Sequence, residues 1–233
     1  VVVNGDDRLP PLGFRQRGPV PTGTRLLLIR HGECVANAFG RAGGPLGDGG
    51  LTPLGQRQCE VLRDRLLASE ELRDARAFYA STLPRARETA AILRPAVPAR
   101  LSLQLDDALE ELRVGEADGL SWEEVAGRFE SPDWDRHPEH PCAPGGESLL
   151  DFYDRCARAI DDLVTRHPGE LVVVVTHGGF IEQAMKIYHR VDARVRLQPR
   201  IENCSMTEIE FRGDYRRLLR YNDLAPLPVT SSS

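Results

Sequence analysis

The sequence predicts an α/β fold in which a largely parallel sheet is covered on both faces by helices. Two patterns lead to this prediction. Short apolar runs of strand length alternate with segments whose apolar residues recur at helical spacing. Two of the runs also end on a histidine followed by glycine, at His31 and His177. Because ligands bind beyond the carboxyl ends of parallel strands, we expect a ligand site where these histidines leave the sheet.

The first half of the chain predicts three strands and two helices. Apolar runs of strand length lie at Arg25–Arg30, Ala77–Ser81 and Leu101–Leu105. Thr52 and Pro53 supply an N-cap and a first-turn proline for a helix that continues to about Ser69. A second helix covers Arg85–Leu93 and must end before Pro95, because the residue before a proline disfavours the helical conformation.

The second half of the chain predicts three helices and three strands. Ser121 and Glu124 form the pattern of a capping box at a helix start, and Ser148 and Gly178 each begin a further helix. The strands lie at Leu171–Thr176, Ser205–Phe211 and Tyr215–Tyr221. The first of these is the most apolar, and the last two are joined at Gly213 as a hairpin.

Composition excludes several classes of protein. The chain has 233 residues with 30 basic and 35 acidic side chains, a net charge of −5. This mild acidity gives no broad positive surface, so we expect no nucleic-acid partner. The longest apolar run, Leu171–Val175, is far below the roughly 18 residues of a membrane-spanning helix, so we expect no membrane association.

Cysteine usage and the N-terminal residues bear on location. Five cysteines are an odd number, contain no Cys-x-x-Cys pair and are too sparse for a disulfide framework. Residues Val1–Gly23 show prolines and scattered charges where a secretory signal would place a continuous apolar stretch. We therefore predict reduced thiols and a cytoplasmic protein.

The length of the chain suits one large domain. Residues 1–24 and 225–233 are rich in proline, glycine or serine and show no periodicity, so we expect two flexible terminal segments. Residues 25–224 lie between them as one catalytic domain. The oligomeric state does not follow from the sequence, and a homo-oligomer remains open.

The two histidines at strand ends indicate chemistry on phosphate. A neutral imidazole is a nucleophile that can accept a phosphoryl group. The transferred group spreads negative charge over its oxygens, which cations stabilise. Arg30 lies beside His31, and Arg85 begins the helix after the second strand. A proton donor for the leaving oxygen is expected among the carboxyl groups of Glu110, Glu111 and Glu116, which composition does not rank.

Seven blocks of the sequence, in order, resemble the histidine phosphatase superfamily in its phosphoglycerate mutase-like branch. They are Arg30-His31-Gly32-Glu33 with Asn37, Leu51-Thr52-Pro53-Leu54-Gly55, Ser81 through Arg85-Ala86 to Thr89-Ala90, Leu109-Glu110-Glu111, Gly115-Glu116-Ala117-Asp118-Gly119, Pro144-Gly145-Gly146-Glu147-Ser148 and Thr176-His177-Gly178-Gly179. The resemblance covers about Arg25 to Phe211 and implies a three-layer α/β/α sandwich.

The resemblance also implies a role for each matching residue. His31 would be the phosphorylated nucleophile, and Glu111 rather than Glu110 would be the general acid and base. The groups that would bind the phosphoryl oxygens and line the phosphate pocket are Arg30, Arg85, His177, the N–H of Gly178, and Asn37. Thr52 is expected to cap a helix rather than to touch the substrate.

Three functions are compatible with these motifs. Residues Phe39–Gly44 lack the Phe-Thr-Gly-Trp stretch of glycolytic mutases, and the segment Ser131–Pro144 resembles that of phosphatases, so we favour a phosphatase of a small phosphorylated metabolite. The first alternative is a phosphoglycerate mutase, which would need 2,3-bisphosphoglycerate as cofactor; a phosphatase would need none. A non-catalytic phosphate-binding scaffold is the second.

Two further features have ordinary interpretations. His137 and His140 stand near Cys142, but Pro138 breaks their spacing, so we predict no metal site. Their segment is instead expected to form a lid loop where Trp134, Arg136 or His137 touches the leaving group. Cys34 is expected to be a small buried residue, and the arginines of the late hairpin, Arg212, Arg216, Arg217 and Arg220, to face solvent.

Overall fold

The computed structural model describes residues 23–129 and 133–225. The predicted flexible segments, residues 1–24 and 225–233, fall outside this range except at their inner ends. Thr24, placed in the first of them, instead begins the first strand and is buried. Among the described residues, no helix is long and apolar enough to cross a membrane.

Within residues 23–129 and 133–225, six strands form one mixed sheet. They are β1 (Thr24–Arg30), β2 (Ala75–Ser81), β3 (Leu103–Asp106), β4 (Leu171–Thr176), β5 (Met206–Arg212) and β6 (Tyr215–Asp223). Their order is β3-β2-β4-β1-β5-β6. The first four are mutually parallel. β5 runs antiparallel to β1, and β6 runs antiparallel to β5 at the edge of the sheet.

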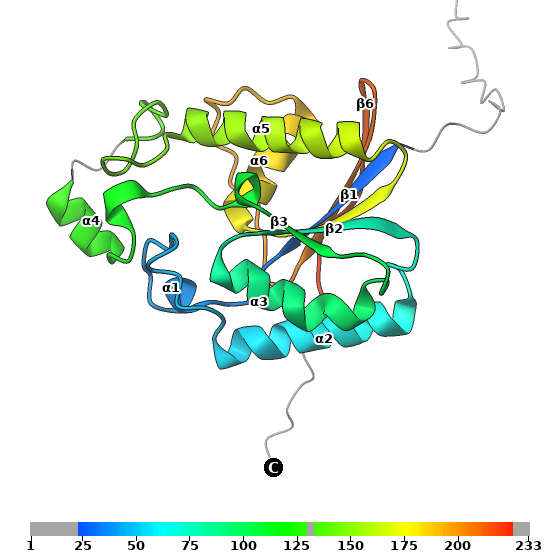
Figure 1. Ribbon diagram of the computed structural model, residues 1–233. Coiled ribbons are helices and arrows are strands. Elements are labelled where there is room, and N and C mark those ends of the chain that lie inside the picture. The colour runs from blue at the N-terminus through cyan, green and yellow to red at the C-terminus, as the bar shows by residue number, and fades with distance from the viewer. Residues whose placement is uncertain (1–22, 130–132, 226–233) are drawn as a thin grey trace, which may run out of the picture.

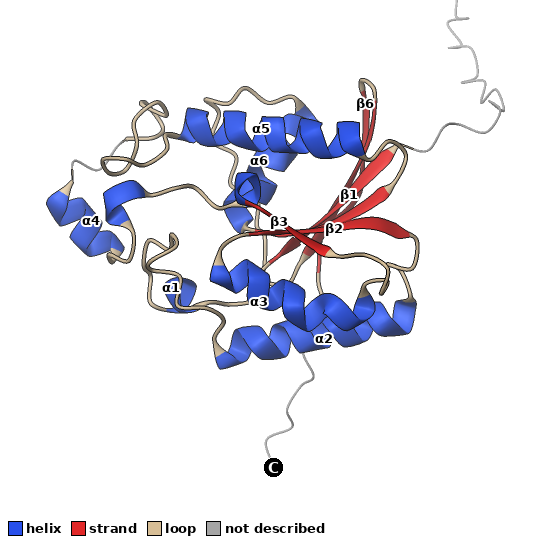
Figure 2. Ribbon diagram, viewed as in Figure 1, coloured by secondary structure: helices blue, strands red, loops and turns tan. Residues whose placement is uncertain are grey.

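The described residues also form six α-helices, whose arrangement relative to the sheet is shown in Figure 1. They are α1 (Val35–Ala38), α2 (Pro53–Ser69), α3 (Pro84–Leu93), α4 (Trp122–Arg128), α5 (Leu149–Arg166) and α6 (Gly178–His189). Short 3-10 turns lie at Arg94–Ala96, Asp107–Leu109 and Gly115–Ala117. The helices α2 and α3 cover one face of the sheet, and α5 and α6 cover the other (Figure 2).

The alternation of side chains along the central strands builds the two cores. In β4, Val173 and Val175 pack against α2 and α3, whereas Val172 and Val174 pack against α5 and α6. All six residues of β4 are buried, as expected of a central strand with helices on both sides. The predicted three-layer α/β/α sandwich with a mostly parallel sheet is confirmed.

The helix starts predicted from capping residues are also confirmed. The Thr52 hydroxyl accepts a hydrogen bond from the Gly55 N–H at 3.0 Å, and Pro53 occupies the first turn of α2. Ser121 and Glu124 form the reciprocal bonds of a capping box at α4. Ser148 does the same at α5 with Asp151 in place of glutamate.

Two features differ from the prediction. The helix α1 is missed, because four residues are too few to show a period. Two arginines of the hairpin do not simply face solvent: Arg216 donates from Nη1 to the Ile187 carbonyl oxygen at 2.7 Å, and Arg220 binds two carboxylates. The Arg220 guanidinium lies 2.6 Å from a carboxylate oxygen of Glu71 and 2.9 Å from one of Glu208. The first of these carboxylates follows α2, so the tertiary fold, and not the local sequence, supplies the partner.

The topology brings the two histidines together. In the parallel pair β1 and β4, Arg30 lies opposite Thr176, so the next residues, His31 and His177, leave the sheet side by side. The helices α1 and α4 and their loops lie beyond this edge of the sheet, on the left in Figure 1. The fold therefore places both histidines past the carboxyl ends of the parallel strands, where the sequence predicts a ligand site.

Candidate active site

His31 sits directly after β1 with its side chain almost wholly buried at 2% exposure. Its Nδ1 lies 2.7 Å from the carbonyl oxygen of Gly32, and this contact requires a proton on Nδ1. The other ring nitrogen, Nε2, is therefore the one that carries a lone pair. A Cβ at Gly32 would lie 2.6 Å from the Gly55 carbonyl oxygen, so only glycine lets α2 pack this closely beside the histidine.

The backbone of His31 is held from the opposite side by the segment before β5. The Asn203 amide donates to the His31 carbonyl oxygen at 2.9 Å, and the Cys204 N–H donates to the Arg30 carbonyl oxygen at 3.0 Å. Sequence reasoning missed Asn203, which lies 172 residues from His31 in the chain. No local pattern distinguishes it from an ordinary loop asparagine.

Arg85 lies between the two histidines. Its Nε is 3.2 Å from His31 Nε2 and also 3.2 Å from His177 Nδ1. Its Nη1 contacts a carboxylate oxygen of Asp48 at 2.5 Å, and its backbone N–H donates to the same carboxylate at 3.0 Å. Both partners of this ion pair are buried, which fixes the guanidinium in place. Asp48 was not predicted, because it lies in a glycine-rich loop without periodicity.

His177 lies behind Arg85 and is fully buried. Its Nε2 is 2.7 Å from the Ser81 hydroxyl at the end of β2, and its ring centroid is 5.1 Å from that of His31. His177 and Gly178 are not among the described residues that line the cavity in front of His31. His177 instead contacts Arg85, and Arg85 lines the cavity.

The environment keeps both imidazoles neutral. Burial, followed by the positive charge of Arg85, holds the pKa of His31 well below its usual range, and Arg30 adds to the effect. The same two leading causes hold the pKa of His177 well below its usual range. At neutral pH, His31 is therefore an unprotonated imidazole, which is the nucleophilic form.

Arg30 lies at the wall of the cavity with part of its guanidinium free. Its Nη1 donates to the Ile201 carbonyl oxygen at 2.5 Å. Its Nε is buried and has no hydrogen-bond partner within the described part of the chain. Burial lowers the pKa of this guanidinium, and the carboxylate of Glu111 opposes the shift. An unpaired buried N–H beside His31 is suited to an anion.

The structure separates the three carboxyl groups that the sequence left unranked. Glu111 lines the cavity, and its two oxygens accept the N–H groups of Gly179 and Leu112 at 3.0 Å each. Glu110 is instead paired with Arg113 at 3.0 Å, and Glu116 is exposed. Only Glu111 of these three faces the reacting region.

Arg155, which sequence reasoning missed, and Glu147, whose motif was noted without a role for this residue, hold this glutamate block. Arg155 of α5 donates to the carbonyl oxygens of Glu110 and Glu111, both at 2.9 Å. Its Nε and Nη2 bind both carboxylate oxygens of Glu147 at 2.7 Å. Glu147 belongs to the Pro-Gly-Gly-Glu-Ser block, so that block supports the general-acid candidate from the side of α5.

A cavity of about 320 Å³ opens in front of these groups. We call Arg30, His31, Arg85 and Glu111 its inner end. We call a second group of lining side chains, which come from α1, α4, the first residue of α5 and the loops, its outer end: Asn37, Arg41, Leu112, Val114, Trp122, Trp134, Leu149 and Arg196. Asn37 is exposed and accepts a hydrogen bond from the Cys34 thiol at 3.1 Å. Cys34 itself is buried, as expected.

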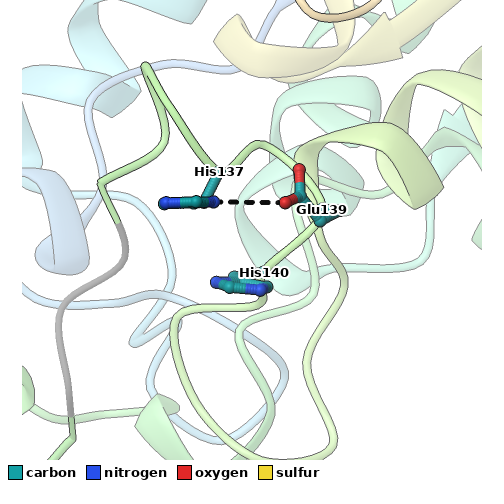
Figure 3. A group of neighbouring side chains, drawn as sticks. All are labelled: His137, Glu139 and His140. Atoms are coloured by element: carbon teal, nitrogen blue, oxygen red, sulfur yellow. Dashed lines mark hydrogen bonds and ion pairs between the residues drawn. The ribbon is translucent and has the colours of Figure 1, made fainter.

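The loop predicted to act as a lid contributes Trp134 to the cavity, whereas Arg136 and His137 are not among the described lining residues. The Trp134 indole N–H donates to the His140 carbonyl oxygen at 2.9 Å. His137, Glu139 and His140 gather on the exposed side of this loop (Figure 3). The two rings are stacked at an interplanar angle of 12°, and one ligand atom of each of the three side chains lies within 4.8 Å of the other two, a spacing that could hold an ion. The absence of a metal site therefore stays a prediction.

Comparison with known proteins identifies the family. The chain matches the histidine phosphatase superfamily (branch 1) over residues 26–224. The chain belongs to this family. The resemblance seen in the motifs is thereby confirmed, and with it the prediction of a histidine-type phosphatase.

Named relatives span most of the chain. Phosphoglycerate mutase-like protein 4 of Arabidopsis thaliana is 32% identical over 88% of this chain and 87% of its own length. The metal-independent phosphoserine phosphatase of the same plant is 30% identical over 88% of this chain and 83% of its own length. Among solved structures, Bacillus stearothermophilus YhfR superposes with a TM-score of 0.73 at 29% identity, covering 86% of this chain and 98% of that one.

Proposed function

We propose that this histidine phosphatase hydrolyses a small phosphorylated metabolite through a phosphohistidine formed on His31. One observation carries the proposal: a neutral, buried imidazole presents Nε2 next to the Arg85 guanidinium at the wall of a cavity. A nucleophile and a fixed positive charge thus meet at the place where a phosphoryl group would be transferred.

In the first step, His31 Nε2 attacks the phosphorus of the monoester. A P–N bond forms, the P–O bond to the leaving group breaks, and the carboxyl group of Glu111 gives its proton to the leaving oxygen. In the second step, Glu111 takes a proton from water as the water oxygen attacks phosphorus. The P–N bond breaks, and inorganic phosphate leaves.

The charge of the phosphoryl group is assigned to the cations of the inner end. Arg30 offers an unpartnered N–H, and Arg85 is oriented by Asp48. We assign His177 and the N–H of Gly178 to the same anion on the family resemblance, supported by their position at the carboxyl end of β4 beside His31. Asn37 is assigned to the pocket because it lines the cavity.

A mutase is the second candidate function, because one relative carries a mutase-like name. The Phe39–Gly44 segment, which lacks the glycolytic mutase pattern, and a relative named as a phosphoserine phosphatase both support the phosphatase. We propose that water is the acceptor, and that neither a metal nor a cofactor is required. The five free cysteines support a cytoplasmic location, with a small phosphorylated molecule as the partner.

The test is phosphate release from a panel of monoesters that begins with phosphoserine and 3-phosphoglycerate. We expect multiple turnovers on at least one compound, unchanged by a chelator. Loss of activity with the chelator would contradict the metal-independent mechanism. Conversion of 3-phosphoglycerate to 2-phosphoglycerate, stimulated by 2,3-bisphosphoglycerate and faster than phosphate release, would establish the mutase instead. Binding without any turnover would indicate the scaffold.

A further inference from the structure

The thiols of Cys59 and Cys204 are in contact with each other, and both residues pack against the backbone at His31. Cys59 lies in α2 and Cys204 lies just before β5, 145 residues further along the chain. Their Sγ atoms are 3.5 Å apart, and both side chains are buried. The proposed function assigns no role to either residue.

The Cys59 side of the pair is connected to both His31 and Arg85. A Cβ on Gly32 would lie 2.8 Å from Cys59 Sγ, so the sulfur is packed against the backbone that follows the histidine. Cys59 Sγ also contacts the Thr89 hydroxyl at 3.5 Å. That hydroxyl accepts the Gly32 N–H at 3.1 Å and donates to the Arg85 carbonyl oxygen at 2.8 Å.

The Cys204 side holds the other edge of the same backbone. Its N–H donates to the Arg30 carbonyl oxygen at 3.0 Å and also lies 3.3 Å from the carbonyl oxygen of His31. The neighbouring Asn203 donates to His31 as well. A movement of either sulfur is therefore transmitted to the nucleophile by direct contacts.

Cys204 can be reached from outside. It lines a second cavity of about 290 Å³, together with Gln58, Arg200, Glu202, Asn203, Leu224 and Ala225. None of these residues lines the active-site cavity, so a small molecule can approach the pair without passing the substrate.

The two thiols also differ in acidity. The hydrogen bond from Cys204, which outweighs burial, lowers the pKa of the Cys59 thiol. The same hydrogen bond, together with burial, raises the pKa of Cys204 far above its usual range. Cys59 is thus the thiol that more readily becomes the nucleophilic thiolate.

We propose that Cys59 and Cys204 are an oxidative modification site, at which hydrogen peroxide forms a disulfide that reversibly inactivates the enzyme. Peroxide that enters the second cavity meets Cys204 first. The Cys204 sulfur attacks it: an S–O bond forms, the O–O bond breaks, and the departing hydroxide takes up the Cys204 proton as water. Cys59, the more acidic thiol, then attacks the Cys204 sulfenic acid. The S–S bond forms, the S–O bond breaks, and the hydroxide leaves with the Cys59 proton as a second water.

Inactivation follows from the contacts around the pair. Since a disulfide bond is about 2 Å long, the sulfurs must draw together from 3.5 Å, pulling α2 and the residue 203–205 segment toward each other. The Cys59 S–H that contacts Thr89 is also lost. Both changes act on the backbone of Gly32 and His31. This consequence for activity rests on the proposed function, whereas formation of the disulfide does not.

The test combines peptide mapping with hydrolysis of p-nitrophenyl phosphate. The full chain is treated with hydrogen peroxide, unfolded, alkylated with iodoacetamide and digested. We expect a Cys59–Cys204 linked peptide, alkylation of Cys34, Cys142 and Cys156, and a loss of activity of at least tenfold. Dithiothreitol should reverse both. Cys59→Ser should stay active in peroxide, whereas the matched control Cys156→Ala, which removes a buried thiol from α5, should be inactivated like the wild type.

The outcomes are separable. If all five cysteines of the wild type remain open to alkylation, or if a different cysteine is oxidised, the proposal is overturned without any need for a folded variant. If the linked peptide forms but the oxidised enzyme keeps activity within twofold of the reduced enzyme, the proposed inactivation is wrong. If the reduced protein hydrolyses no phosphomonoester, the proposed function fails, and the mapping still decides whether the disulfide forms.

Discussion

The inner and outer ends of the active-site cavity are held in different ways. At the inner end, His31 and Arg85 are buried. Arg85 contacts His177, which directly follows β4, and Asn203, in the segment before β5, binds the His31 carbonyl oxygen. At the outer end, Trp122 is 47% exposed, and Arg196 is held by a 5.9 Å contact with the Trp134 ring and a 3.7 Å ion pair to Asp135. In the proposed mechanism, the sheet therefore holds the groups that react, whereas the leaving group contacts loops that can vary without disturbing those groups.

The largest expected effect on kcat/KM is that of replacing His31 at the inner end, compared with His137 in the loop that contributes Trp134 to the outer end. His31→Ala removes the phosphoryl acceptor, and we expect kcat/KM to fall by about 10⁴-fold or more. The matched control, His137→Ala, removes an exposed imidazole of the outer loop and should change kcat/KM by less than about threefold. Steady-state hydrolysis of p-nitrophenyl phosphate measures both. Substantial activity in His31→Ala would end the proposed mechanism.

A smaller effect at the inner end depends on the leaving group. Glu111→Gln removes the proton donor, so hydrolysis of an alkyl phosphate should slow by about 100-fold, but that of p-nitrophenyl phosphate by only a few-fold. The reason is that nitrophenolate leaves without protonation. Glu110→Gln, which removes a carboxylate paired with Arg113, should slow both substrates equally. Equal losses in Glu111→Gln would contradict its role as the acid.

The buried histidines also make the inner end sensitive to acid. The folded state keeps His31 and His177 neutral with lowered pKa values, whereas the unfolded chain binds protons below about pH 6.5. Stability present above that pH is therefore lost as the pH falls. Between pH 7.5 and 5.5, the free energy of unfolding should fall, by up to about 1.4 kcal/mol for each histidine, the limit set by protonation of the unfolded imidazole.

Urea unfolding at the two pH values measures this dependence. His177→Gln should remove about half of the contribution of the pair, because glutamine does not titrate. His137→Ala, at the exposed outer loop, should keep the full dependence. An unchanged pH dependence in His177→Gln would show that the buried imidazole is not the group that resists protonation.

The smallest effect is expected at the outer end. Trp134→Ala shortens the wall of the cavity without touching the inner-end residues, so KM for a bulky monoester should rise by about three- to tenfold with kcat nearly unchanged. Trp134→Phe should restore most of the affinity. A large fall in kcat for Trp134→Ala would contradict the claim that the outer end affects binding and not the chemical step.

The same distinction explains how much of the site could be predicted from the sequence. His31 and His177 follow directly from strands with a strong apolar pattern, and their neighbourhood in space follows from the parallel pairing of β1 and β4. The family motifs then assigned the role of Glu111, which periodicity alone could not separate from Glu110. The inner end of the cavity could therefore be predicted from local sequence patterns, strand topology and the family motifs together.

The residues that were missed act across long stretches of chain. Asp48 holds Arg85 from a glycine-rich loop, Asn203 holds His31 from 172 residues away, and Arg155 holds the glutamate block from α5. Each is a polar side chain that packing buries wholly or in part, so its local sequence resembles that of a solvated residue. Arg220 was misjudged for the same reason, since Glu71 reaches it from the end of α2.

The most direct test of the central claim is to trap the phosphorylated enzyme. Rapid mixing with a ³²P-labelled substrate, followed by quenching in alkali and peptide mapping, should give an acid-labile, base-stable phosphoryl group on the peptide that contains His31. The same treatment of His31→Asn should give none. Label on a different residue, or turnover with no phosphoenzyme under conditions that would accumulate it, would contradict the account.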